Sequence, residues 1–165
     1  MVGILHFMPI STHICRVFLV VLLTFLLVPA AQAATLSQSE RSLLGAVNDV
    51  RADHSLRPLK VDPKLLATAR AYSATMIEQD VFTHGAFAAR LARSDARGPA
   101  FGENLAWGTG RLANARNVVR MWMESPGHRA NLLRPGWTRV GIGARVGNFL
   151  GYPGATVITA DFAGT

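Results

Sequence analysis

Apolar residues recur every three or four positions in three stretches of the chain, which is the spacing of one face of an α-helix. The first helix is expected from the capping-box sequence at 37–40 to about residue 54, and the second begins at Asp62-Pro63, an N-cap followed by proline. The third ends before Ser125-Pro126, where the same signature predicts a new short helix. The apolar faces of the three long helices comprise Leu43, Leu44, Val47 and Val50; Leu66, Ala69, Ser73, Met76 and Ile77; and Ala115, Val118, Val119, Trp122 and Met123.

The C-terminal part of the chain instead alternates apolar and polar residues, which is typical of half-buried strands. This alternation predicts strands over Trp137–Val146 and Ala155–Phe162, and the glycine-rich stretch 147–154 predicts that they form a hairpin. A shorter strand is expected over Gly102–Trp107, and residues 80–85 are expected to form a loop. Helices that come first and an antiparallel pair that comes last indicate the α+β class.

The N-terminal segment has the three parts of a secretory signal peptide. Arg16 supplies a positive charge, Val17–Val28 is an uncharged apolar run, and Ala31-Gln32-Ala33 is a small-x-small cleavage sequence. We expect residues 1–33 to be removed and residues 34–165 to be secreted or released into the periplasm as one domain, with no membrane span. The alternative is an uncleaved membrane anchor, but the apolar run is shorter than the roughly 20 residues of a spanning helix.

Charge and cysteine content narrow the choice of partners. The chain carries 17 Lys and Arg against 10 Asp and Glu, a formal net charge of +7, and its basic residues are spread without a continuous run. Nucleic acid is therefore not an expected partner, because such proteins present a basic stripe interleaved with aromatic residues. The single cysteine, Cys15, lies in the signal segment. We expect the exported domain to be a monomer that its core alone holds together.

Three histidines remain after cleavage, and two of them are candidates for chemistry. His54 lies in a polar stretch and is expected to be a solvated loop residue. His84 lies in the loop after the second helix, and His128 falls near the third position of the short helix, where the helix dipole favours neutral imidazole. Two neutral histidines and a carboxylate suffice for a zinc site. Spacing alone does not bring His84 and His128 together, because 44 residues separate them.

Three motifs resemble, in order and spacing, the signature of a known family. They are Phe82-Thr83-His84, Gly102-Glu103-Asn104-Leu105, and the run WMESPGHRANLL over residues 122–133. Together with Asn48-x-x-Arg51 and the C-terminal strand, they are similar to the CAP superfamily of cysteine-rich secretory proteins, antigen five and pathogenesis-related proteins. The sequence looks most like the bacterial SCP-domain branch, and the resemblance covers almost the whole mature chain.

The resemblance implies an α-β-α sandwich, in which a small antiparallel sheet lies between helices and a central cleft holds two histidines and two acids. Carried onto this sequence, the four cleft residues are His84, Glu103, Glu124 and His128, with the two histidines as the metal ligands. Glu124 departs from the longer eukaryotic members, in which the second acid lies farther beyond the tryptophan. The absence of cysteine from residues 34–165 departs from the animal and plant members as well.

A structural role is the alternative for several of these residues. Glu103 could cap a helix or pair with Arg51 or Arg129, and Asn104 could tie a loop to the backbone. Asn48 and Arg51 lie one turn apart on the first helix, so we expect them to hold a loop by hydrogen bonds. Other large apolar residues are expected in the core, on the cleft wall or against the sheet: Trp107, Trp122, Trp137, Phe149, Leu150 and Tyr152.

The expected function is that of a binding module, whose cleft holds a divalent cation such as zinc and recognises a cell-envelope ligand or an apolar molecule such as a lipid. Two alternatives stay open. One is a hydrolase in which a histidine or the metal activates water while Glu103 acts as general base. The other is a structural envelope protein with a vestigial cleft. No serine or cysteine nucleophile lies beside the histidines in a recognisable motif, which disfavours the hydrolase.

Overall fold

The computed structural model describes residues 35–164, which form an α+β domain, as the sequence predicts. The expected signal peptide, residues 1–33, lies outside this described part. Within it, no helix has the length and apolar character needed to cross a membrane. The elements follow one another in the order α1 (Gln38–Asp53), β1 (Lys60–Val61), α2 (Pro63–Gln79), α3 (Phe87–Arg93), β2 (Phe101–Gly108), η1 (Gly110–Ala113), α4 (Ala115–Glu124), α5 (Pro126–Leu132), β3 (Trp137–Phe149) and β4 (Tyr152–Gly164).

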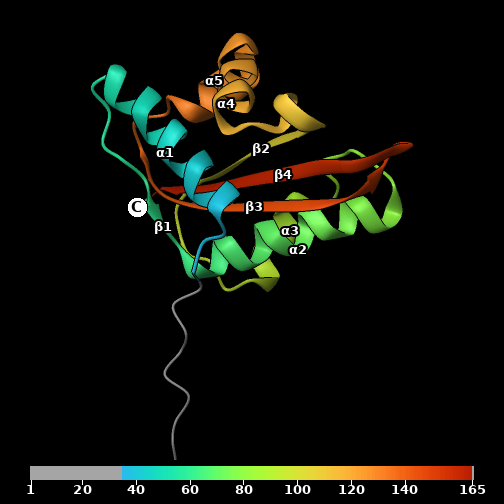
Figure 1. Ribbon diagram of the computed structural model, residues 1–165. Helices are drawn as coiled ribbons and strands as arrows, with labels where there is room; N and C mark the ends of the chain where they lie inside the picture. The colour runs from blue at the N-terminus through green and yellow to red at the C-terminus, as the bar shows by residue number, and fades with distance from the viewer. Residues whose placement is uncertain (1–34, 165) are drawn as a thin grey trace, which may run out of the picture. The chain divides into compact units, whose positions relative to one another are not determined.

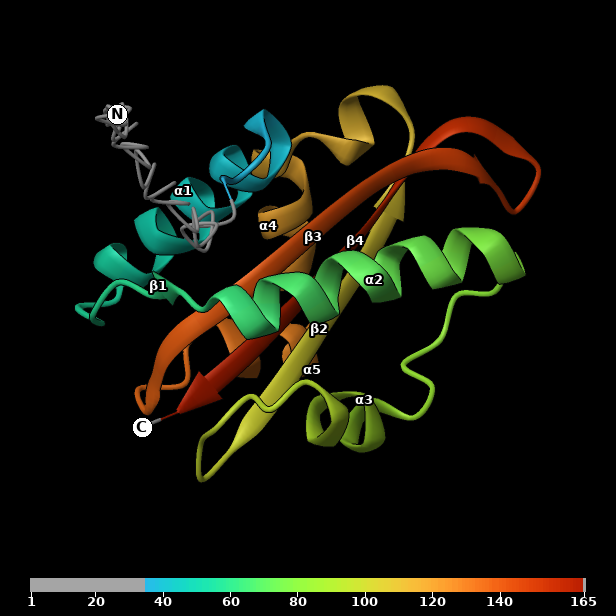
Figure 2. The ribbon, with the colours of Figure 1, turned by 90° about the horizontal axis from the view of Figure 1, so that it is seen from below.

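Four strands form one sheet in the order β1-β3-β4-β2. β1 runs parallel to β3, whereas β3 pairs with β4 and β4 pairs with β2 in antiparallel fashion. Helices α1, α4 and α5 cover one face of the sheet, and α2 and α3 cover the other (Figure 1 and Figure 2). This arrangement is the α-β-α sandwich that the resemblance implies, and it places β2 at one edge of the sheet.

The helices begin where their capping residues predict. Ser37 Oγ accepts a hydrogen bond from the Glu40 amide, and Glu40 Oε2 accepts one from the Ser37 amide at 2.7 Å, which completes the capping box of α1. Asp62 caps α2 and Asn114 caps α4 by accepting from amides of the first turn. Ser125 precedes α5 as expected, but its hydroxyl makes no capping hydrogen bond. The proline that follows it therefore supplies the start signal of α5.

Helix α2 lies directly on β3 because two glycines of that strand face it. A β-carbon on Gly141 would lie 2.0 Å from the backbone of Leu65, and one on Gly143 would lie 2.4 Å from the backbone of Ala69. Ser73, farther along the helix, donates a hydrogen bond to the carbonyl of Gly143 at 3.2 Å. Any side chain at these two strand positions would push the helix away from the sheet.

The main core lies between the sheet and helices α1 and α4. Its largest fully buried side chains are Trp122 and Trp137, and the ring of Trp137 stacks on Phe162 with centroids 6.3 Å apart. A second apolar cluster includes Tyr72 and Met76 of α2. Both faces of the sheet are therefore packed against helices.

The C-terminal hairpin is confirmed, but its strands are longer than predicted. β3 continues to Phe149 and β4 starts at Tyr152, so Leu150 and Gly151 alone form the turn, both with positive φ. The Asp80 carboxylate at the end of α2 accepts a hydrogen bond from the Leu150 amide, which holds the turn against the helix. Phe149 is buried on the sheet as predicted, whereas that prediction is wrong for Leu150, in the turn, and for Tyr152, directly after it, because both are exposed.

Three elements are missed by the sequence pattern: β1, α3 and the short 3₁₀ helix η1. β1 has two residues, Lys60–Val61, which is too short for an alternating pattern, and it exists through its pairing with β3. α3 begins after Ala86, whose side chain offers no acceptor to cap a helix. The loop predicted over residues 80–85 is confirmed, and α3 follows it closely.

Candidate functional site

The loop between α2 and α3 places His84 against the edge strand β2. The Nδ1 atom of His84 lies 2.7 Å from Oε1 of Glu103, a carboxylate whose side chain is 2% exposed. The imidazole itself is 58% exposed. Because a carboxylate only accepts hydrogen bonds, Nδ1 carries a proton, and in the neutral form of the ring Nε2 keeps an available lone pair.

Arg90 of α3 holds the second oxygen of Glu103. Its guanidinium forms an ion pair with Oε2 and also donates from Nη1 to the carbonyl of His84 at 2.7 Å. Glu103 therefore pairs with Arg90, and the alternative pairing with Arg51 or Arg129 does not form. The reason is that the Glu103 side chain points to the face covered by α2 and α3, whereas those two arginines lie on α1 and α5, which cover the opposite face.

Tyr72 of α2 supports both the loop and Arg90. The guanidinium of Arg90 lies over the Tyr72 ring, 3.2 Å from its centroid. The Tyr72 hydroxyl donates to the carbonyl of Thr83 at 2.6 Å. Burial raises the pKa of Tyr72, so this hydroxyl stays a donor. The residue that precedes His84 is thus tied to α2.

His128 reaches the cleft from the first turn of α5. The ring is half-buried, and the backbone carbonyl of His128 accepts a hydrogen bond from Asn104 Nδ2 at 3.0 Å. Burial lowers the pKa of His128, and the nearby charge of His84 lowers it further. The imidazole is therefore neutral at physiological pH, as expected. Desolvation is the main cause of the lowered pKa, whereas the sequence analysis attributed the neutral form to the helix dipole.

Two asparagines join β2 to α5. Asn131 donates from Nδ2 to the Glu103 carbonyl and to Asn104 Oδ1, each at 3.0 Å, and Asn104 is fully buried. Gly102 permits this approach, because a β-carbon there would lie 2.9 Å from Asn131 Oδ1. In the Gly-Glu-Asn motif, the glycine therefore admits α5, the carboxylate faces α3, and the amide holds α5 to the strand.

Glu124 and Arg129 lie at the surface. Glu124 is the last residue of α4, Arg129 lies on α5, and both are exposed. Neither side chain has a hydrogen bond or an ion pair with another residue in the range 35–164. Glu124 therefore has no contact with His84, Glu103 or His128 of the kind that would complete a set of four.

The Asn48-x-x-Arg51 pair makes hydrogen bonds to loops. The Asn48 side chain bonds both the amide and the carbonyl of Leu59, at 2.8 and 3.2 Å. Arg51 is fully buried, and burial lowers its pKa. Its guanidinium donates to four backbone carbonyls: those of Arg57, Leu132, Arg134 and Trp137.

A groove of about 320 Å³ lies along β2 beside His128. Its walls are mainly apolar and aromatic, with Phe82 from the loop, Leu105 and Trp107 from β2, and Met121 from α4. The carbonyl of Leu105 accepts a hydrogen bond from Trp122 Nε1 at 2.9 Å, which anchors α4 to the strand beneath the groove. His128 and Ser125 supply its polar lining.

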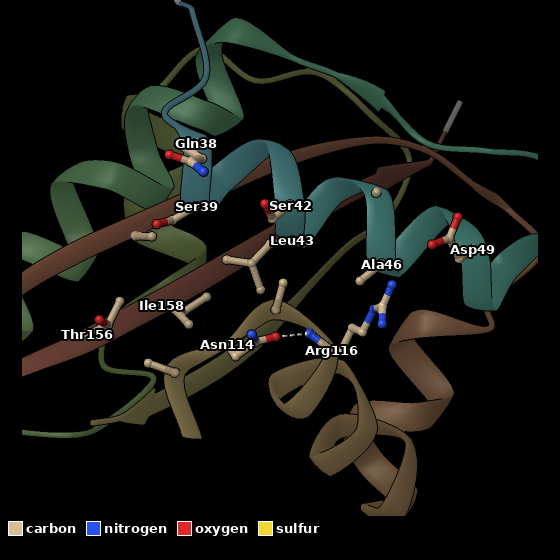
Figure 3. A pocket seen from close by; sticks show the side chains of 14 residues that line it. Gln38, Ser39, Ser42, Leu43, Ala46, Asp49, Asn114, Arg116, Thr156 and Ile158 are labelled. Atoms are coloured by element: carbon tan, nitrogen blue, oxygen red, sulfur yellow. Dashed lines mark hydrogen bonds between the residues drawn. The ribbon is translucent and has the colours of Figure 1, made fainter. Parts of the chain in front are cut away.

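A larger cavity of about 540 Å³ lies between α1 and the start of α4, and no described residue that lines it is a histidine. Figure 3 shows Ser42 and Asp49 on α1 near Asn114 and Arg116 of the neighbouring segment. Leu43 of α1 also lines it, but most of its lining is polar. No sequence motif points to this cavity.

The described residues do not fit a zinc site with three protein ligands. Within the range 35–164, no group of three or more His, Cys, Asp or Glu side chains is placed to hold a metal ion. Both oxygens of Glu103 are engaged, one by His84 and one by Arg90, and the guanidinium charge opposes a cation beside them. The expected zinc site on His84 and His128 thus lacks a free carboxylate.

Three residues around Glu103 are not indicated by any sequence motif: Tyr72, Arg90 and Asp161. Arg90 lies in α3, a helix that the pattern does not predict. Asp161 is a polar position of an alternating strand, yet it is 0% exposed and lies opposite Glu103 in the β2–β4 register. The burial of Asp161 could have been predicted from the expected sandwich. If helices cover both faces of the sheet, the polar positions of its central strands are buried as well.

Comparisons with known proteins agree with the fold. The family model described as "CAP: Cysteine-rich secretory protein family" matches residues 44–162. The uncharacterized protein YkwD of Bacillus subtilis (strain 168) is 31% identical over 115 residues, which is 67% of this chain and 44% of YkwD. Pathogenesis-related protein 1C of Nicotiana tabacum is 31% identical over 112 residues, 67% of this chain and 57% of that protein. The chain thus spans about half the length of these relatives.

A solved structure extends the likeness to three dimensions. The extracellular protein containing an SCP domain from Bacillus anthracis str. Ames superposes with a TM-score of 0.65 at 25% identity, covering 77% of this chain and 40% of that one. The region matched by the family model runs from α1 to β4 and includes His84, Glu103 and His128. With the family model and relatives in agreement over about two thirds of its length or more, the chain belongs to the CAP family of cysteine-rich secretory proteins.

Proposed function

We propose that this CAP domain is a binding module whose groove along β2 takes an apolar ligand that ends in a hydroxyl or carboxyl group. The observation that carries the proposal is the position of the groove, whose apolar and aromatic walls lead to the imidazole of His128. Ligand sites typically bury an apolar body against such walls and orient it through a few polar groups. A volume of about 320 Å³ suits a small ligand.

His128 lines the groove, and His84 lies near enough for its charge to lower the pKa of His128, so we assign the polar end of the site to these two imidazoles. His84, with Nδ1 engaged by Glu103, offers Nε2 as an acceptor. Neutral His128 offers one donor and one acceptor. A hydroxyl or carboxyl group can therefore be bound without a cation. Because Glu103 has no free oxygen and Arg90 adds a positive charge, an organic ligand fits this site better than a divalent metal ion.

Trp107 supplies the main aromatic wall. Its ring packs against Phe149 and Tyr152, with centroids 5.6 and 5.4 Å away. Rings held in this way lose little conformational freedom when a ligand binds, which favours affinity. Removing the Trp107 side chain should therefore weaken binding without disturbing the imidazoles.

A hydrolase is the second candidate, because a histidine hydrogen-bonded to a carboxylate is the arrangement of a general base. Glu103 itself is a poor base, since both of its oxygens already accept hydrogen bonds. The base would be Nε2 of His84. Within residues 35–164, however, no hydroxyl donates a hydrogen bond to either cleft imidazole, so the usual nucleophile–base pair is not formed.

We infer that the domain acts outside the cytoplasm. Residues 1–33 have the pattern of a signal peptide, and the similar Bacillus anthracis protein is described as extracellular. Residues 34–165 contain no cysteine, so folding does not depend on the redox state of the compartment. Both the periplasm and the cell exterior suit such a domain.

Fluorescence titration with 8-anilinonaphthalene-1-sulfonate, an apolar aromatic probe with one anionic group, tests the binding site. We expect the mature domain to bind this probe and Trp107→Ala to bind it about tenfold more weakly. Val146→Ala removes an apolar side chain that is 72% exposed and outside the groove, and it should bind like the parent. Equal affinities of the two variants, both shown to be folded by circular dichroism, would refute the groove as the site.

A further inference from the structure

Asp161 is a buried carboxyl group beside Glu103. The two residues lie opposite each other in the β2–β4 register, so their side chains share one face of the sheet, with β-carbons about 5 Å apart. Asp161 is 0% exposed, and among the described residues neither of its carboxyl oxygens has a hydrogen-bond partner. An ionised carboxylate held in this way would be buried without a donor, which is strongly unfavourable.

The titratable and charged groups around Asp161 come from each element packed against it. They are Tyr72 of α2, His84 of the loop, Arg90 of α3 and Glu103 of β2, while its partner on β3 is Gly141. Within this cluster, Arg90 supplies one positive charge, and Glu103 already pairs with it. One guanidinium balances one carboxylate, so the buried cluster is neutral when Asp161 carries a proton.

We propose that Asp161 is the positioning residue of the cleft: as a neutral carboxylic acid, it donates a hydrogen bond to Glu103 and fixes the orientation in which Glu103 holds His84. Glu103 then accepts three hydrogen bonds, from His84 Nδ1, from Arg90 Nη2 and from the Asp161 hydroxyl. Two ionised carboxylates have no proton to share, so their contact becomes a hydrogen bond only when one of them is protonated.

The electrostatics of the cluster support this assignment. Burial is the largest effect and the charge of Glu103 the next, and together they raise the pKa of Asp161 well above its ordinary value, while Arg90 opposes them. Both oxygens of Glu103 accept direct hydrogen bonds, from Arg90 and His84, whereas neither oxygen of Asp161 receives one from a described residue. The proton therefore belongs on Asp161.

This proton has a consequence for the tautomer of His84. With Glu103 held from three sides, the imidazole keeps its proton on Nδ1, and Nε2 is left for a ligand. The effect on ligand binding rests on the function proposed above. The protonation of Asp161 does not, because it follows from the packing of β2, β4 and α3 alone.

Infrared spectroscopy of the mature domain labelled with carbon-13 aspartate tests the proton directly at neutral pH. A neutral carboxylic acid has a carbonyl stretch distinct from the bands of a carboxylate. We expect this acid band in the parent, its loss in Asp161→Asn, and its full retention in Asp53→Asn, which changes an exposed carboxylate on α1. A parent without the acid band, or a band that survives in Asp161→Asn, would overturn the proposal.

Nitrogen-15 NMR of the His84 ring, at a pH where it is neutral, tests the positioning role. The side-chain amide introduced by Asp161→Asn can still donate to Glu103, so this variant should keep the Nδ1–H tautomer, whereas Asp161→Leu should raise the share of the Nε2–H tautomer several-fold. An unchanged tautomer in folded Asp161→Leu, or loss of the Nδ1–H tautomer in Asp161→Asn, would overturn the role. An acid band in a parent that fails to bind the fluorescent probe would count against the proposed function alone.

Discussion

Arg51 brings a positive charge into the interior of the protein. Hydrogen bonds to backbone carbonyls, and not an ion pair with a carboxylate, stabilise this charge. Its guanidinium donates to four carbonyl groups, three of which lie between the end of α5 and the start of β3. A planar fork with five donors suits this set of acceptors, whereas a lysine ammonium offers three donors from one point. Arg51 thus ties α1 to the chain that leads from α5 into β3.

Arg51→Lys is expected to lower the free energy of unfolding by about 2–4 kcal/mol, because buried carbonyls lose their donors. Arg129→Lys is the matched control, since Arg129 is exposed on α5. That variant should lie within about 0.5 kcal/mol of the parent. Urea denaturation followed by circular dichroism measures both. A similar loss of stability in the two variants would show that the hydrogen bonds of the buried Arg51 guanidinium do not contribute to the free energy of unfolding.

Asp161 is expected to make the domain less stable as the pH rises. In the unfolded chain this carboxyl group loses its proton near its ordinary pKa of about 3.9. Burial and the charge of Glu103 raise its pKa in the folded state, so above that ordinary value the folded state binds more protons than the unfolded state. The free energy of unfolding therefore falls with increasing pH until the pKa of the folded state is passed.

Asp161→Asn removes this dependence. Its free energy of unfolding, relative to the parent, should increase from about pH 4 upward, by at most about 1.4 kcal/mol per pH unit. Chemical denaturation of both proteins over a series of pH values provides the measurement. A difference that is constant or shrinks with pH would mean that Asp161 is ionised in the folded protein.

At the scale of elements, the contact between α2 and β3 determines where the loop carrying His84 begins. Gly143→Ala would place a methyl group 2.4 Å from the α2 backbone and is expected to destabilise the domain by at least about 2 kcal/mol. Gly45→Ala, in α1 with no atom within 4 Å of the added carbon, should instead stabilise it by about 0.5–1 kcal/mol. Thermal unfolding compares them. A Gly143→Ala domain as stable as the parent would disprove this close packing.

Elements with strong local signals could be predicted from the sequence. α1 and α2 have capping side chains, and β3 and β4 alternate over many residues. α3 and β1 could not, because α3 is a seven-residue helix without a capping side chain and β1 forms by pairing with Arg139 and Val140. The sequence did not show which residues of 147–154 form the hairpin turn. Its first position with positive φ is occupied by Leu150, where glycine or asparagine would be expected.

The cleft was partly predictable for a different reason. His84, Glu103 and His128 stand in motifs whose order resembles a known family, so they could be named before their geometry was known. Their supporting residues depend on tertiary structure: Arg90 acts from the unpredicted α3, and Asp161 is buried only because helices cover both faces of the sheet. The zinc expectation assumed a free carboxylate, which the Arg90 ion pair removes.

For the whole molecule, we predict export with cleavage after Ala33. Mass spectrometry of the protein recovered from the periplasm or the culture fluid should give the mass of residues 34–165. Ala33→Phe places a bulky side chain at the cleavage position and should leave the signal attached. An exported parent protein that still contains residues 17–28 would overturn this prediction and make the domain membrane-anchored.

One measurement decides most directly whether the ligand site is the groove along β2 or the larger cavity beside α1. It is a two-dimensional nitrogen-15 NMR titration of the mature domain with 8-anilinonaphthalene-1-sulfonate. We predict the largest shift changes at the Trp107 indole and at the amides of β2 and of His128, with little change at Ala46 and Arg116, which line the larger cavity. Changes concentrated at Ala46 and Arg116, with Trp107 and His128 unaffected, would contradict the proposed site.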